Sequence, residues 1–285
     1  MNRSLIGATT TMQSIQQKMD VISNNLSNLN TVGYKRRGAT FQDVLTSVYQ
    51  QTQPFNKEGR MTPLGFPQGM GAKLGAIELS LEQGVLQNTN LPSDVAIDGT
   101  GLFEIERNAL DNEGNPQIAW TRDGSFQLVP DRNDPNQLIL MTKMGDIVRS
   151  ATDEPIRIPP NHAFTIDERG RVLAKDKAQS DAQPIQVGQL KLVRPIRPQM
   201  LSSIGNNLFG LPQGLAVDGI LENMDLAADN ENGRIAIRQG YLEGSNVNIA
   251  EEMVELVNAQ RAYSLNSRVL SSSDTLMDLT NNLRT

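Results

Sequence analysis

The sequence predicts an α+β fold in which an N-terminal and a C-terminal helix pair as a coiled-coil-like hairpin, with an all-β, mostly antiparallel domain inserted between them. Apolar residues near the N-terminus recur with heptad spacing, and residues 248–283 contain no Gly or Pro. Between these stretches the apolar period changes to two, which is typical of strands. We expect a terminal helical domain formed by residues 1–33 with residues 244–285, an extended connector at residues 34–75 and a β domain at residues 76–243.

The first helix is predicted over residues 4–30 from two series of apolar residues, each with members seven positions apart. The other positions are mostly Asn, Gln, Ser and Thr, and only Arg3, Lys18 and Asp20 are charged. With so few charges beside its apolar seam, this helix is expected to be enclosed by other protein. Gly33 is suited to the left-handed conformation that follows a helix end. The seam consists of Leu5, Ala8, Met12, Ile15, Met19, Ile22, Leu26 and Leu29.

The second helix is predicted over residues 248–283, with Asn248 as N-cap and Glu251 in position to complete a capping box. At about 100° per residue, its apolar side chains form two stripes on roughly opposite sides. One apolar face is enough to dock a helix on its own protein. We expect the first stripe to face the N-terminal helix and the second to face outward as an interaction surface. The first stripe is Ile249, Met253, Leu256, Tyr263, Leu270 and Met277, and the second is Ala262, Leu265, Val269, Leu276, Leu279 and Leu283.

The connector begins with a short basic step, Tyr34 to Arg37, and continues as a stretch rich in Gln, Gly and Pro. This composition favours an extended segment. A short helix is predicted around Phe41–Tyr49.

Short strands with regular turn signals predict a sandwich or an irregular barrel from residue 76 onward. Asp123-Gly124 between two apolar runs predicts a type I′ hairpin, and Glu168-Arg169-Gly170 a weaker one. The expected strands lie at residues 77–81, 95–97, 102–105, 118–120, 126–129, 138–141, 147–148, 156–158, 164–166, 172–173 and 189–193.

Composition limits the possible partners. The chain has 285 residues, a net charge of −6 and no cysteine. The negative charge argues against nucleic acid or an anionic membrane surface as the main partner. No apolar run is long enough to insert into a lipid bilayer, and the N-terminus lacks the pattern of a cleaved signal peptide.

A catalytic site is not evident in the residues. His162 is the single histidine and is expected to be an ordinary loop residue. Asp94, Asp98 and Asp123 lie near tight turns, where Asp serves mainly turn chemistry, although two of them could form an acid/base pair. We expect no enzyme activity, no metal and no cofactor.

Four separated stretches resemble the flagellar rod and hook proteins of bacteria. They are SNNLSNLNTVGYK at residues 23–35, QGVLQNTNLPSDVAIDGTGLF at residues 83–103, WTRDGSF at residues 120–126 and QGYLEGSNVNIAEEMVELVNAQRAY at residues 239–263. Residues 140–235 carry little of the resemblance. The chain departs from the family pattern at Ser23 and Ser27, which replace the usual alanines, and at Leu102, where Phe is common.

The resemblance implies a structural subunit of the flagellar basal body, closest in size to the distal rod protein and its Gram-positive relatives. Such a subunit polymerises with itself and with other rod and hook proteins into a hollow tube, and leaves the cytoplasm through the flagellar type III export apparatus without a cleaved signal. The implied assembly interface comprises Leu5, Met12, Ile15, Met19, Ile22, Asn24, Asn25, Leu26, Asn28, Gly33, Tyr34, Lys35, Met253, Leu256, Tyr263, Leu265, Val269, Leu276, Leu279 and Leu283.

Three alternatives stay open. A hook-type axial protein would share the same motifs but usually carries an additional outer domain. An extracellular binding module with a coiled-coil stalk would form a discrete dimer or trimer instead of a polymer. A wall hydrolase acting through paired carboxylates would depend on residues such as Asp94 and Asp123.

Overall fold

The computed structural model describes residues 2–43, 46–49, 66–69, 71–110, 116–131, 134–176, 183–212, 217, 219–224 and 235–283. The chain divides into two compact units. The helical unit comprises Met1–Ser27, Arg37–Glu78 and Asn248–Thr285, and the β unit comprises Asn28–Arg36 and Leu79–Val247. Terminal helices flank a mostly antiparallel all-β region, so the predicted α+β class is confirmed.

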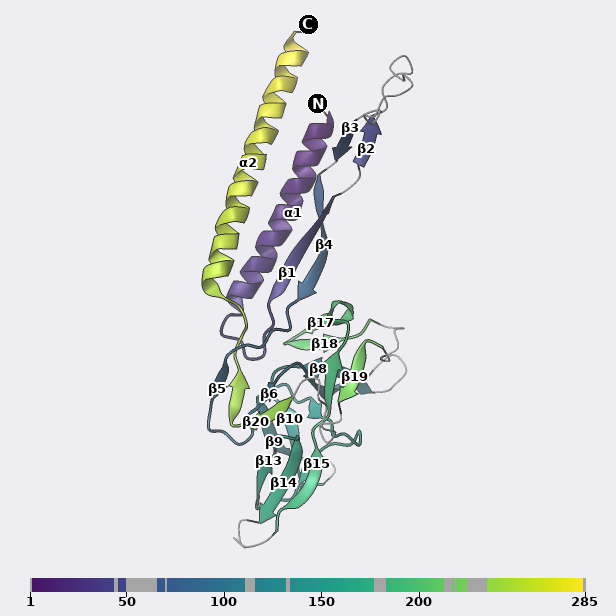
Figure 1. The fold of residues 1–285 in the computed structure, drawn as a ribbon, viewed down its shortest axis with the longest axis vertical. Coiled ribbons are helices and arrows are strands. Elements are labelled where there is room, and N and C mark those ends of the chain that lie inside the picture. The colour runs from purple at the N-terminus through teal and green to yellow at the C-terminus, as the bar shows by residue number, and fades with distance from the viewer. Residues whose placement is uncertain are drawn as a thin grey trace, which may run out of the picture. The chain divides into compact units, whose positions relative to one another are not determined.

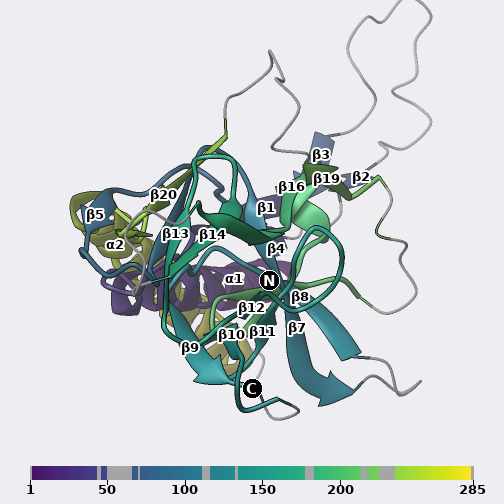
Figure 2. The same ribbon diagram turned by 90° about the horizontal axis from the view of Figure 1, so that it is seen from below.

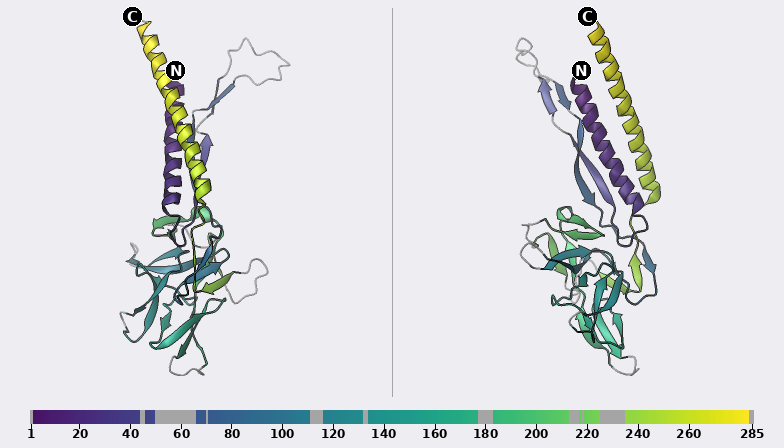
Figure 3. Two further views of the ribbon diagram at one scale, coloured as in Figure 1. Left: turned by 90° about the vertical axis from the view of Figure 1, so that its left-hand side faces the viewer. Right: turned by 180° about the vertical axis from the view of Figure 1, so that it is seen from behind.

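The helical unit contains an antiparallel pair of long helices, α1 (Asn2–Ser27) and α2 (Ile249–Asn282). Figures 1 and 3 show the two helices side by side with the N- and C-termini at the same end, and α2 continuing beyond the first residue of α1. Lys18 Nζ lies 2.5 Å from Glu255 Oε2 across the pair. The predicted seam of α1 faces inward, because its residues from Leu5 to Leu29 are all buried or half-buried.

The predicted N-cap of α2 is confirmed. Asn248 Oδ1 accepts the backbone N–H of Ala250 at 3.1 Å, which satisfies one of the free donors of the first turn. Glu251 Oε1 accepts a hydrogen bond from the Asn248 side-chain amide at 3.0 Å. In a full capping box, Glu251 would accept the backbone N–H of Asn248 instead.

Strands accompany the helices in this unit. β1 (Arg37–Asp43) pairs with β4 (Ala72–Leu79), and β2 (Thr46–Tyr49) pairs with β3 (Phe66–Gly69). The predicted helix at Phe41–Tyr49 is therefore wrong, since its described residues belong to β1 and β2. Thr, Val, Phe and Tyr dominate this stretch and favour strands once a partner strand is available. The start of β4 lies against α1, because a Cβ added at Gly71 would be 2.9 Å from the Gly7 carbonyl oxygen.

The β unit is built from antiparallel strand pairs. Its largest sheet has the order β12-β10-β11-β7-β8-β18-β17, with β9 on β10, and β16 on both β7 and β19; smaller sheets are β13-β14-β15, β20-β6 and β21-β5. β7, with 9 residues, is the longest described strand of this sheet and pairs with β8, next to which it is labelled in Figure 2. The strands are β5 Leu86–Asn88, β6 Val95–Asp98, β7 Leu102–Leu110, β8 Pro116–Thr121, β9 Phe126–Pro130, β10 Leu138–Thr142, β11 Ile147–Val148, β12 Arg157–Ile158, β13 His162–Ile166, β14 Arg171–Asp176, β15 Ile185–Gln189, β16 Leu192–Pro195, β17 Ser202–Gly205, β18 Leu208–Gly210, β19 Leu221–Met224, β20 Ala236–Gln239 and β21 Tyr241–Glu243, with a 3₁₀ turn at Pro198–Met200.

One of the two predicted hairpins forms. β13 and β14 pair across the Glu168–Gly170 turn, where Gly170 has φ +73°. The Asp123-Gly124 hairpin is wrong, because β8 pairs with β7 and β18 whereas β9 pairs with β10. Gly124 is required by a close approach: a Cβ there would lie 1.6 Å from the Val95 carbonyl oxygen.

The core of the β unit has two apolar clusters. Phe103 and Phe126 meet edge to face in the larger one, with ring centroids 5.2 Å apart. Trp120 lies in the smaller one with Leu102 and Phe209. Because these side chains come from β7, β8, β9 and β18, burial of the core fixes the order of the central strands.

Candidate functional site: a buried motif junction and an exposed helix face

The carboxylate of Glu243 is the centre of a buried charge cluster in the β unit. Lys35 Nζ lies 2.7 Å from Glu243 Oε1, and Arg122 Nε donates to Oε2. The side chains of Lys35, Arg122 and Glu243 are only 1–2% exposed. The backbone N–H of Gly84 donates to Oε1 at 2.8 Å. We call these four residues the motif junction.

The two cations of the motif junction have further acceptors. Arg122 donates to the backbone carbonyls of Ile97, Gly99 and Gly101, and Lys35 Nζ donates to the Glu82 carbonyl at 2.6 Å. Burial lowers the pKa of Lys35, and the nearby Glu243 carboxylate acts in the opposite direction. Such extensive hydrogen bonding is what a buried charge cluster needs to be tolerated.

Close backbone packing surrounds the charges. Gly33 has φ +67°, and a Cβ on it would lie 2.6 Å from the backbone nitrogen of Asp123. The N–H of Gly33 donates to the backbone carbonyl of Glu243 at 2.8 Å. Glycine is therefore required at this position both by the backbone conformation and by the lack of space.

The segments that lead out of α1 and into α2 are bound next to each other in the β unit. Asn246 Oδ1 accepts the N–H of Arg36 at 2.7 Å, and Asn246 Nδ2 donates to the carbonyls of Ser80 and Glu82. Asn207 Nδ2 donates to the Val32 carbonyl at 2.8 Å. All four stretches that carry the family resemblance thus supply residues to, or next to, the motif junction.

In the helical unit, Asn25 performs a similar bridging role. Its side chain accepts the N–H of Arg37 at 3.0 Å and donates to the Arg37 carbonyl at 2.9 Å and to Glu252 Oε2 at 3.2 Å. Asn25 and Glu252 are each 1% exposed. One buried amide therefore connects α1, the start of β1 and the first turn of α2.

In contrast to these buried polar contacts, α2 carries exposed apolar side chains along its length. Five aliphatic side chains on one side of the helix are 52–86% exposed, and their spacing of three, four and seven residues is that of a coiled-coil seam. The last of them lie at the C-terminal end of α2, and this end of the helix continues beyond the start of α1 (Figure 1). We call them the outer stripe: Leu265, Val269, Leu276, Leu279 and Leu283.

The remaining interface candidates fall into three groups by exposure. Asn24 and Met253 are exposed, and Leu5, Met12, Ile15, Met19, Leu26, Asn28, Leu256 and Tyr263 are half-buried. Ile22, Asn25, Gly33, Tyr34 and Lys35 are buried within the chain. The expectation that Ile249 and Met253 face α1 is wrong, because they are 46% and 54% exposed; Glu252 and Ala259 take the inward positions.

Two of the three aspartates near tight turns have side-chain contacts within the chain. Asp98 Oδ2 pairs with Arg238 at 2.7 Å, and Asp123 Oδ1 accepts the N–H of Ser125 at 2.9 Å. His162 Nδ1 is 3.0 Å from the Pro160 carbonyl. Within the described ranges, no group of three or more His, Cys, Asp or Glu residues is placed to hold a metal ion. None of the described helices is both long enough and apolar enough to cross a membrane.

Sequence reasoning missed a further buried carboxylate that binds two cations, Glu104. It accepts hydrogen bonds from Arg149 at 3.1 Å and Trp120 Nε1 at 3.3 Å, and it pairs with Lys191 at 2.9 Å. Burial opposes the charge of Lys191, but hydrogen bonds to Asp153 and Glu104 outweigh it and raise its pKa. The only signal of Glu104 in the sequence is that a charged residue stands within an apolar strand.

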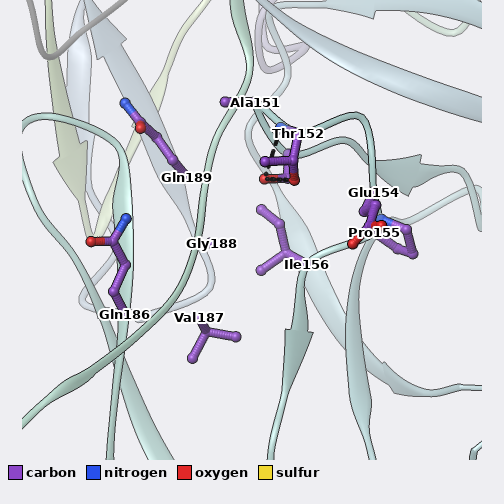
Figure 4. Close-up of a pocket in the computed structure, with 10 residues that line it drawn as sticks. Ala151, Thr152, Glu154, Pro155, Ile156, Gln186, Val187, Gly188 and Gln189 are labelled. Atoms are coloured by element: carbon purple, nitrogen blue, oxygen red, sulfur yellow. Dashed lines mark hydrogen bonds between the residues drawn. The ribbon is translucent and has the colours of Figure 1, made fainter.

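A hollow of about 320 Å³ lies between the turn before β12 and strand β15 (Figure 4). Thr152 donates to Ser150 Oγ at its rim. Glu154 is the single ionisable side chain among its lining residues. The lining residues are Ser150, Ala151, Thr152, Glu154, Pro155, Ile156, Gln186, Val187, Gly188 and Gln189.

Three segments of the chain match known protein families. Residues 7–35 match the family described as flagella basal body rod protein. Residues 96–174 match the D1 domain of flagellar hook protein FlgE/F/G, and residues 238–283 match the C-terminal part of flagellar basal body rod FlgEFG protein. Lys35, Arg122 and Glu243 each lie in a different one of these segments.

Full-length relatives agree with these matches. The chain is 38% identical to the flagellar basal-body rod protein FlgG of Borreliella burgdorferi, over 100% of this chain and 99% of the relative. It is 36% identical to FlgG of Caulobacter vibrioides over 99% of both chains. It is also 34% identical to the flagellar hook-basal body complex protein FlhP of Bacillus subtilis over 100% of both.

Proposed function

This chain belongs to the family of flagellar basal-body rod and hook proteins and is a structural subunit of the basal body, and we propose that it polymerises into the hollow rod as a distal-rod-type subunit. The rod would transmit torque and let exported subunits pass through its channel. Relatives named FlgG and FlhP match over nearly their whole length, which supports the distal-rod type over the hook type.

The observation that carries this proposal is the outer stripe of α2. Exposed aliphatic side chains at coiled-coil spacing are unfavourable in water and favourable once another helix covers them. The stripe includes Leu276, which is 54% exposed, and Leu283, which is 86% exposed. A subunit that is soluble only until it assembles accounts for such a surface.

The outer stripe sharpens the proposed interface. Ile22, Asn25, Gly33, Tyr34 and Lys35 are buried in the chain and leave little surface for a neighbour. The interface proposed for neighbouring subunits therefore consists of the outer stripe, Met253, Asn24 and the outer edges of the half-buried seam residues. The division into a terminal helical domain, a connector and a β domain remains part of the proposal.

We also propose that the partners are proteins: further copies of this chain, other rod and hook proteins, and the flagellar type III export apparatus. The net charge of −6 supports this choice over nucleic acid or a lipid surface. The terminal helices are proposed to form only a weakly held pair before assembly and to become fully ordered in the polymer, as for other segments that fold on binding.

The position in the flagellum can be tested directly. A functional tagged copy should be recovered in purified hook–basal bodies, and deletion of the gene should stop assembly before the hook forms. Hooks of normal length on cells that lack the chain would rule out a rod role. A tag found only in the hook would favour the hook-type alternative.

A further inference from the structure

The motif junction binds the two chain segments that lead out of α1 and into α2. Segment 28–36 follows α1 directly, and residues 243–247 precede α2 directly. Within the β unit, Gly33 and Lys35 of the first segment contact Glu243, and Arg36 contacts Asn246 of the second. The chain between these segments is more than 200 residues long, yet the two exits are hydrogen-bonded side by side.

This arrangement reduces the cost of forming the helix pair. Two helices at opposite ends of a long chain must first find each other, and helix nucleation in isolation is unfavourable. When their inner ends are already held together, each helix can grow outward against the other at a high effective concentration. We propose that Glu243 is a positioning residue for assembly, which holds the two helix exits together so that α1 and α2 pair before a neighbouring subunit covers them.

Glu243 is the residue through which the contacts converge. Its carboxylate binds Lys35 from the first exit, and Arg122 and Gly84 from the body of the β unit, while its backbone carbonyl binds Gly33. Loss of the carboxylate charge weakens the hold on the first exit while leaving the apolar core of the β unit in place. The proposal rests on the polymerising function above.

Glu243→Gln in the full chain tests the proposal, and Glu104→Gln is the matched control. Both carboxylates are buried in the β unit and bind two cations, but Glu104 contacts Arg149, Lys191 and Trp120 and neither helix exit. Circular dichroism measures the helices, the unfolding midpoint of Trp120 emission measures the β unit, and light scattering measures polymer formation. Trp120 is the single tryptophan of the chain.

Glu243→Gln should lose helical signal and raise the protein concentration needed for polymerisation by roughly tenfold, the loss expected for a hydrogen bond to a charged group. Glu104→Gln should leave both unchanged at temperatures where Trp120 reports a folded β unit. Equal effects of the two variants, or no effect of Glu243→Gln, would overturn the proposal.

If Glu243→Gln unfolds the β unit, Asn246→Ala serves as the second test of the proposal. It removes the contact with Arg36 from a half-buried site and should shift helix content and polymerisation in the same direction by a smaller factor. An unchanged Asn246→Ala chain would overturn the proposal. A wild-type chain that has normal helix content but never polymerises would instead contradict the proposed function.

Discussion

Lys35 and Glu243 are 208 residues apart in the sequence, and their side chains meet at 2.7 Å with each only 1% exposed. A buried ion pair is seldom the most stabilising choice for a protein interior. We expect its value in this chain to lie in specificity, because arrangements that leave either buried charge unpaired are disfavoured. In this chain the arrangement joins the exit of α1, the approach to α2 and the loop after β8.

Removing one charge of this pair should lower the stability of the β unit. Lys35→Met is expected to lower the free energy of unfolding of the β unit by about 3 kcal/mol, because it leaves the Glu243 carboxylate with one fewer buried partner. Denaturant unfolding followed by Trp120 emission measures this change. Arg238→Met is the control, since Arg238 pairs with Asp98 at a half-exposed site and should cost less than about 1 kcal/mol. A similar loss for both variants would contradict the special role of the motif junction.

Gly33 should tolerate substitution poorly for two separable reasons. Gly33→Ala is expected to destabilise the β unit by about 3 kcal/mol, because Ala tolerates positive φ poorly and its Cβ meets the backbone of Asp123. Gly145→Ala has the same kind of φ, +88°, but nothing within 4 Å of the added Cβ. It should therefore cost only about 1–2 kcal/mol. Equal midpoints for the two variants would show that space around Gly33 does not matter.

Local patterns predict most elements of this fold. The heptads from Leu5 to Leu29 and the Asn248 cap identify both helices, because the α-helical period and its end groups are written in neighbouring residues. Period-two runs identify most strands of the β unit. Residues 189–193 were expected as one strand, whereas residues 190–191 interrupt it and separate β15 from β16. The hairpin of β17 and β18, with Asn206 and Asn207 at positive φ, was missed although Asn tolerates such turns.

The charge clusters could not be predicted, because their members are distant in sequence and no local rule pairs them. Lys35 and Arg122 stand in polar stretches and read as surface residues. Asp123-Gly124 has the composition of a hairpin, but Gly33 and Val95 pack against it and β9 pairs elsewhere. Tertiary contacts override turn propensity there. At Phe41–Tyr49, by contrast, the residue types favour strands, and the partner strands β4 and β3 complete the pairing.

Asn25 is expected to be essential to the helical unit. Asn25→Ala removes the side chain that binds the N–H and C=O of Arg37. It should lower the free energy of unfolding of the helical unit by about 2–3 kcal/mol. Circular dichroism melting measures this change. Gln17→Ala, which removes an amide from an exposed position of α1, should change the free energy of unfolding by less than about 0.5 kcal/mol. Indistinguishable melts would contradict the bridging role of Asn25.

The pair of Asp153 and Lys191 should give a defined pH dependence. The hydrogen bond from Lys191 lowers the pKa of Asp153 below its ordinary value of 3.8, so the stabilisation is present above that value and is lost as the pH falls through the lower folded pKa. The pKa of Lys191 is raised, so its contribution is lost only as the pH rises beyond 10.5. Asp153 has φ +63°, a conformation that Asn also tolerates.

Asp153→Asn should therefore be less stable than the wild type by a constant amount between about pH 5 and pH 9, and the gap should close in acid. The gap should not exceed about 1 kcal/mol, because the Asp153 side chain is more than half exposed. Denaturant midpoints across the pH range measure it, with Glu154→Gln as the neighbouring control. A gap that widens in acid would have the wrong sign for this pair.

A substitution in the outer stripe should affect polymerisation without affecting the stability of the monomer. Leu276 is 54% exposed on the side of α2 that faces away from α1, so Leu276→Glu should leave the helix content and unfolding of the monomer unchanged. In a polymer the same position would bury an unpaired carboxylate, which should raise the concentration needed for polymerisation by roughly tenfold or more. Thr275→Glu adds the same charge at the neighbouring exposed position outside the stripe and should polymerise like the wild type. If Leu276→Glu instead unfolds the monomer, the stripe packs within the chain and the surface offered to neighbouring subunits must lie elsewhere on α2.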